Sequence, residues 1–211
     1  MNATASLSAI VLAGGQSSRM GRDKALIPLQ GVPLLRRVCE VALNCASEVY
    51  VVTPWPERYQ DILPDGCRVI QEVLLSGETE NREPQAEHLS HGPLVGFAQG
   101  LAQVNTDWVL LLACDLPQLQ VKVLQDWAKE LEKTEQEAIA LLPRHSKGWE
   151  PLCGFYRRQC LPFLTDFINA GGRSFQRWLA QHPVQELPAS DTQLFFNCNT
   201  PADLERLCES E

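Results

Sequence analysis

The stretch that decides the fold reads SAIVLA over residues 8–13 and continues as GGQSSRMGRDK over residues 14–24. Its first part is uncharged and rich in β-branched residues, which is typical of a strand buried in a parallel sheet. The second part cannot continue that strand, because Gly14 and Gly15 allow a sharp turn and leave no Cβ between the main chain and a ligand. Successive N–H groups in such a turn form a concavity that suits phosphate oxygens. Arg19 and Lys24 add two cations, so the stretch predicts a loop that binds a polyphosphate.

This loop differs from the two commonest phosphate-binding loops. It has no Gly-Lys-Ser/Thr of a Walker A motif, and it lacks the third glycine of a dinucleotide-binding turn. A plain strand-to-loop turn with solvated charges is the alternative reading of two adjacent glycines. The close succession of Arg19, Gly21 and Lys24 favours phosphate binding instead.

A second candidate site follows the most apolar segment of the chain, WVLLLA over residues 108–113. Asp115 follows it after Cys114, at the carboxyl edge of the predicted sheet, where open α/β sheets bind ligands. Burying a carboxylate without a partner is costly, and Mg²⁺ bridging to phosphate oxygens is a natural partner. The alternative is that Asp115 caps the next helix. Together with the 14–24 loop, Asp115 predicts a metal site.

Composition limits the class of protein. The chain has 211 residues and a net charge of −8, which fits one globular domain and argues against nucleic acid as a partner. Residues 1–8 lack the pattern of a signal peptide, and no apolar run approaches the roughly 20 residues of a membrane span. We therefore expect a cytoplasmic protein without membrane contact. The eight scattered cysteines then indicate buried thiols in a reducing compartment, rather than disulfides or a zinc site.

The order of elements predicts the architecture. Apolar strands alternate with amphipathic helices along almost the whole chain, which favours an open α/β sheet of mostly parallel strands. Residues 76–91 are polar and charged, so we expect an insertion near the mouth of the site. Residues 194–196 are expected to form a short strand. Asn197 and Asn199 follow it and either direct their amides to a substrate or stabilise their own loop through Asx hydrogen bonds.

These motifs resemble those of nucleotidyltransferases with a nucleotide-diphosphosugar-transferase fold, and most closely those of the molybdenum cofactor guanylyltransferases. The resemblance rests on LAGG with RMG and DK over residues 12–24, and on GPLVG over 92–96, CDLP over 114–117, PLCGFY over 151–156 and NCNTPADL over 197–204. It implies a single domain over residues 1–211, folded as a Rossmann-like three-layer sandwich. The implied reaction transfers GMP from GTP to molybdopterin cofactor and releases pyrophosphate.

The resemblance also implies roles for individual residues. Leu12, Ala13, Gly14, Gly15, Lys24, Glu72 and Asp115 would bind the nucleotide. Arg19, Lys24 and Asp115 would be catalytic, with Asp115 holding Mg²⁺, the implied cofactor. Asn197 and Asn199 would bind the acceptor, and molybdoenzyme maturation proteins would receive the product. Glu72 is a departure, because the family usually has an aspartate near this position.

Three rival functions remain at this stage. Cytidylyltransferases usually have Ala-Ala-Gly where this chain has Ala13-Gly14-Gly15. Sugar-phosphate nucleotidyltransferases favour Arg-Leu over Arg19-Met20. The presence of both Lys24 and Asp115 argues against a non-catalytic carrier that binds GTP or molybdopterin, because a carrier needs no metal carboxylate.

Overall fold

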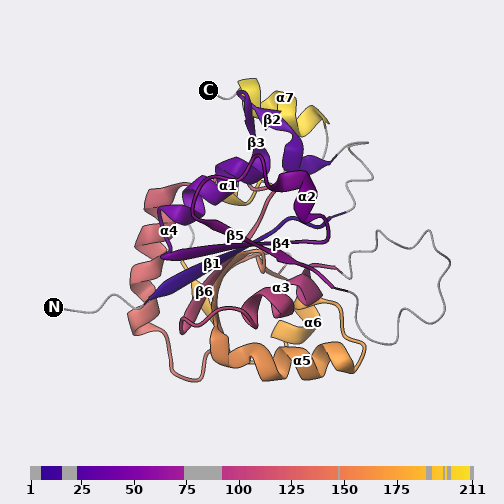
Figure 1. The fold of residues 1–211 in the computed structure, drawn as a ribbon. Coiled ribbons are helices and arrows are strands. Elements are labelled where there is room, and N and C mark those ends of the chain that lie inside the picture. The colour runs from indigo at the N-terminus through magenta and orange to yellow at the C-terminus, as the bar shows by residue number, and fades with distance from the viewer. Residues whose placement is uncertain are drawn as a thin grey trace.

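The computed structural model describes residues 6–15, 23–73, 92–146, 148–188, 192–196, 198 and 201–209. Its centre is a mixed sheet with the strand order β10-β7-β9-β6-β1-β4-β5, to which the short β8 is added beside β7 (Figure 1). The strands are β1 Leu7–Leu12, β2 Pro28–Leu29, β3 Val32–Pro33, β4 Glu48–Thr53, β5 Cys67–Gln71, β6 Trp108–Ala113, β7 Ala140–His145, β8 Gly148–Trp149, β9 Cys153–Arg157 and β10 Val184–Leu187.

The helices cover both faces of this sheet, and α7 lies beside the small β2–β3 hairpin (Figure 1). They are α1 Leu34–Leu43, α2 Pro56–Tyr59, α3 Pro93–Leu101, α4 Val121–Ala128, α5 Leu161–Asn169, α6 Phe175–Leu179 and α7 Pro201–Glu209. Short 3₁₀ helices are formed by Lys24–Leu26, Lys129–Lys133, Arg158–Cys160 and Thr192–Phe195. Among the helices described, none is long and apolar enough to cross a membrane.

The alternation of side chains along the central strands divides the core into two layers. Ala9 and Val11 of β1 pack with Leu35 and Val38 of α1 on one face, where α4 also contributes. Ile10 of β1 faces the other way, into the cluster built from α3, α5 and α6. Helices on both faces explain why β6, and β1 apart from Ser8, are apolar rather than alternating in polarity. The predicted three-layer α/β sandwich is confirmed.

Strand direction brings distant segments to one edge of the sheet. β1, β4, β5 and β6 pair in parallel, so their carboxyl ends lie together. β9 is antiparallel to both β6 and β7, which makes β7 parallel to β6. The end of β7 and the start of β9 therefore join the same edge, where the Gly14–Gly15 turn and Asp115 also lie.

Two expectations about the last third of the chain need correction. The predicted strand at 194–196 is wrong, because Thr192–Phe195 forms a 3₁₀ helix. Leu194 is buried there and Phe195 stacks on Trp127 of α4, so the apolar run serves packing rather than strand pairing. Sequence analysis also missed β10, which extends the sheet beside β7. The predicted insertion at 76–91 lies outside the described residues.

Candidate active site

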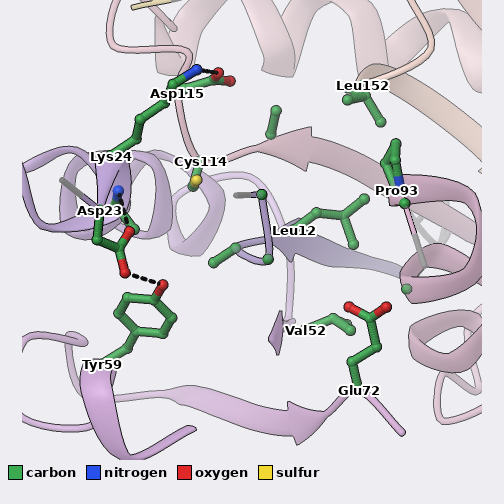
Figure 2. Close-up of a pocket in the computed structure, with 17 residues that line it drawn as sticks. Leu12, Asp23, Lys24, Val52, Tyr59, Glu72, Pro93, Cys114, Asp115 and Leu152 are labelled. Atoms are coloured by element: carbon green, nitrogen blue, oxygen red, sulfur yellow. Dashed lines mark hydrogen bonds and ion pairs between the residues drawn. The ribbon is translucent and has the colours of Figure 1, made fainter. Parts of the chain in front are cut away.

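A cavity of about 410 Å³ opens at this edge of the sheet (Figure 2). The Gly14–Gly15 turn after β1, the Lys24 turn, the end of β6 and the start of α3 all contribute to its wall. The lining residues are Leu12, Ala13, Gly14, Gly15, Asp23, Lys24, Ala25, Val52, Tyr59, Glu72, Gly92, Pro93, Gly96, Ala113, Cys114, Asp115 and Leu152. Segments that are separated by up to 140 positions in the sequence thus enclose one site.

Lys24 and Asp115 meet at the wall of the cavity. The Lys24 Nζ lies 3.5 Å from Asp115 Oδ2, and each side chain is 18% exposed. Burial raises the pKa of the Asp115 carboxyl above its ordinary value, while the Lys24 charge acts in the opposite direction. A mostly buried carboxylate, whose ionisation is opposed by burial, benefits from a nearby cation.

Glu72 lies across the cavity from Asp115 (Figure 2). Its position is set by backbone contacts, because its N–H donates to the Thr53 carbonyl at 2.8 Å. A Cβ added at Gly14 would lie 3.2 Å from Glu72 Oε2, and one at Gly96 would lie 3.4 Å from the same oxygen. The two glycines therefore leave room for the Glu72 carboxylate beside the loop. Glutamate needs this room because it is longer than the aspartate expected near this position.

The C-terminal segment also reaches this edge. The Cys198 N–H donates to the Asp115 carbonyl at 3.1 Å, which ties residues near the C-terminus to the loop after β6. Asn197 and Asn199 adjoin Cys198 in the chain but lie outside the described residues, as does Arg19. The other predicted site residues line the one cavity: Leu12, Ala13, Gly14, Gly15, Lys24, Glu72 and Asp115.

Comparisons with known proteins agree with this geometry. The family model described as "MobA-like NTP transferase domain" matches residues 9–186. The chain belongs to this family. A "Probable molybdenum cofactor guanylyltransferase" of Nostoc sp. is 59% identical over 198 residues, which cover 94% of this chain and 88% of that protein. A protein of the same name from Synechococcus elongatus is 43% identical, with 94% and 96% covered.

A solved structure shows the same fold. The molybdopterin-guanine dinucleotide biosynthesis protein A of Archaeoglobus fulgidus superposes with a TM-score of 0.72 at 24% identity, covering 96% of this chain and 97% of that one. Its sheet is therefore built as in this chain. Membership of the MobA-like NTP transferase family identifies the chain as a nucleotidyltransferase.

Nucleotidyltransferases generally use a divalent metal, and the donor set here fits one. Mg²⁺ takes one or two carboxylates and completes its shell with phosphate oxygens and water. Asp115 supplies such a carboxylate on the cavity wall. Among the described residues, no group of three or more His, Cys, Asp or Glu side chains forms a ready-made metal site. The metal would therefore bind together with the substrate phosphates.

Glu150 is a site neighbour that sequence analysis did not single out. The β6–β9 register pairs Leu112 with Cys153, and the Ala113 N–H donates to the Leu152 carbonyl at 3.0 Å. Glu150 follows this ladder in the chain, and its carboxyl lies near enough to Asp115 for the two charges to interact. Burial raises the pKa of the Glu150 carboxyl, His145 lowers it from 3.5 Å away, and the Asp115 charge raises it.

This arrangement predicts how stability changes with pH. Because the folded-state pKa of Glu150 exceeds its ordinary value of 4.5, ionisation of this group costs stability. The cost is absent below pH 4.5, grows as the pH rises through the folded-state pKa, and is complete above it. Glu150→Gln should therefore lose less stability than the wild type between acid and neutral pH. Urea unfolding of both proteins across this range measures the difference, and parallel profiles would contradict the assignment.

Proposed function

We propose that this protein transfers GMP from GTP to the phosphate of molybdopterin cofactor, releasing pyrophosphate and forming the guanine dinucleotide of the cofactor. One observation carries the proposal: the Gly14–Gly15 turn, Lys24 and Asp115 line a single cavity at the carboxyl edge of the sheet. Relatives named molybdenum cofactor guanylyltransferase, at up to 59% identity, support this choice of substrates.

The nucleotide is held between two chemically different walls. We place the guanine near Glu72, because a carboxylate accepts hydrogen bonds and guanine offers N–H donors at N1 and N2. The backbone of Leu12, Ala13, Gly14 and Gly15 contacts the nucleotide at the loop. The triphosphate then reaches Lys24, which offsets part of its negative charge. Arg19 belongs to the same loop and serves the same purpose in this proposal.

The reaction needs positioning and charge neutralisation more than a covalent nucleophile. The acceptor's phosphate oxygen attacks the α-phosphorus of GTP, the bond to the β-phosphate oxygen breaks, and pyrophosphate leaves with the electron pair. Asp115 would hold Mg²⁺, which when bound neutralises charge on the phosphate oxygens. Lys24, which pairs with Asp115 at 3.5 Å, contacts the same phosphates in this proposal.

The acceptor approaches from the side of Asp115 that lies away from Glu72. The Cys198 N–H ties the C-terminal segment to the Asp115 main chain. We assign Asn197 and Asn199 to acceptor binding on that basis, together with the resemblance of their motif. Molybdoenzyme maturation proteins are the proposed recipients of the product.

Pyrophosphate release tests the proposal. Purified protein is mixed with Mg²⁺ and molybdopterin cofactor, and GTP is compared with CTP, ATP and UTP. Release with GTP alone is expected. Release with CTP would instead identify a cytidylyltransferase, and GTP binding without release would identify a carrier. Glu72→Gln, measured with GTP and ATP, tests the placement of the base. A carboxylate only accepts hydrogen bonds, whereas an amide also donates, so this variant should prefer GTP over ATP less strongly than the wild type.

A further inference from the structure

A hydrogen bond joins the Lys24 turn to a helix 36 residues away in the sequence. Tyr59, the last residue of α2, is 1% exposed and lines the cavity. Its hydroxyl donates to Asp23 Oδ2 at 2.7 Å (Figure 2). Burial raises the pKa of the Tyr59 hydroxyl, and the bond to Asp23 raises it further, so this group remains a donor. The bond connects the loop after β1 to the element after β4.

Asp23 uses its second oxygen to hold the turn that carries Lys24. Asp23 Oδ1 accepts the Ala25 N–H at 3.0 Å and so caps the 3₁₀ helix Lys24–Leu26. The turn closes with the Leu26 N–H donating to the Asp23 carbonyl at 3.3 Å and the Ile27 N–H donating to the Lys24 carbonyl at 3.1 Å. Lys24 is therefore the first residue of a turn whose cap is oriented by Tyr59.

The side chains of Asp23 and Lys24 point in opposite directions. Figure 2 shows the Asp23 carboxylate directed at Tyr59, whereas Lys24 extends the opposite way to Asp115. An Asp23 carboxylate that turned toward Lys24 would pair with its ammonium and compete there with a triphosphate. The Tyr59 hydroxyl, with Arg58 Nη1 4.0 Å from the same oxygen, holds the Asp23 carboxylate away from the Lys24 ammonium.

We propose that Tyr59 is a positioning residue that acts through Asp23 to hold Lys24 toward the triphosphate. This rests on the proposed role of Lys24 as a phosphate ligand. Tyr59 transfers no proton and forms no bond in the reaction. Its contribution is to restrict Lys24 to the orientation that binds phosphate, so that less conformational entropy is lost when the nucleotide binds.

Tyr59→Phe tests the proposal, because it removes the hydroxyl and keeps the buried ring. Tyr50→Phe is the matched control: Tyr50 is also buried, and its hydroxyl donates to Glu48 Oε2 at 3.1 Å, away from the cavity. Isothermal titration gives the Kd of GTP and of inorganic tripolyphosphate, each with Mg²⁺. We expect Tyr59→Phe to weaken both ligands about threefold to tenfold and Tyr50→Phe to leave both unchanged.

Combining Tyr59→Phe with Lys24→Met distinguishes a role of Tyr59 through Lys24 from a purely structural role of Tyr59. If Tyr59 acts through Lys24, adding Tyr59→Phe to Lys24→Met leaves the Kd of tripolyphosphate where Lys24→Met alone puts it. Equal weakening by Tyr59→Phe with and without Lys24 would overturn the proposal, as would unchanged binding in Tyr59→Phe. Tripolyphosphate carries neither a base nor an acceptor group, so its binding is measured without GTP turnover. A protein that binds tripolyphosphate as expected but does not turn over GTP would overturn the proposed function and leave the role of Tyr59 intact.

Discussion

Asp115→Asn should lower kcat for pyrophosphate release about 10²- to 10³-fold, the loss that follows removal of one charge-stabilising group from an active site. The substitution keeps the size of the side chain but removes the charge that would hold the metal. Its neighbours on the cavity wall, Lys24 and Leu152, stay in place. The measurement is initial rate against Mg²⁺ concentration with saturating GTP and acceptor.

A direct metal readout accompanies this rate measurement. Mn²⁺ binding in the presence of GTP, followed by electron paramagnetic resonance, should weaken in Asp115→Asn. Asp126→Asn is the control, since Asp126 lies on the exposed face of α4 and pairs with Lys122 and Lys129. Metal-dependent turnover that survives in Asp115→Asn would show that the metal is held elsewhere.

Lys24→Met should lower kcat/KM for GTP about 10- to 100-fold. Charge-assisted hydrogen bonds contribute about 1.5–3 kcal/mol, and each 1.4 kcal/mol is a factor of ten in rate or affinity. Lys24→Arg should recover only part of this loss, because a planar guanidinium cannot occupy the place of a compact ammonium beside Asp115. Lys122→Met on the surface of α4 is the matched control and should leave kinetics unchanged.

Lys24→Met should also change how the stability of the protein depends on pH. Lys24 lowers the pKa of Asp115 against the effect of burial, so its removal raises that pKa further. Ionisation of Asp115 then costs more, and the loss of stability relative to the wild type should be larger at pH 7 than at low pH, where the carboxyl is protonated. An equal loss at both pH values, measured by urea unfolding, would rule out an electrostatic origin.

Local sequence signals were sufficient for much of the fold and part of the site. The apolar runs before Gly14 and before Asp115 identified two central strands, because strands buried on both faces are mostly apolar. The rule that ligands bind at the carboxyl ends of parallel strands then placed Lys24 and Asp115 together before any coordinates. The strand predicted at residues 194–196 was wrong, because three apolar residues pack equally well in a strand or in a 3₁₀ helix.

The sequence by itself therefore determined the α/β class and singled out the glycine loop and the two charged residues, Lys24 and Asp115, that pair at the wall of the cavity. Only the tertiary structure decided that the Tyr59 hydroxyl donates to Asp23, that the Asp115 charge acts on Glu150 and that the Cys198 N–H donates to the Asp115 carbonyl. The physical reason is the distance along the chain over which each kind of signal acts. Periodicity and turn chemistry act over a few residues, whereas these contacts join segments 35 to 83 positions apart and depend on strand register and helix placement.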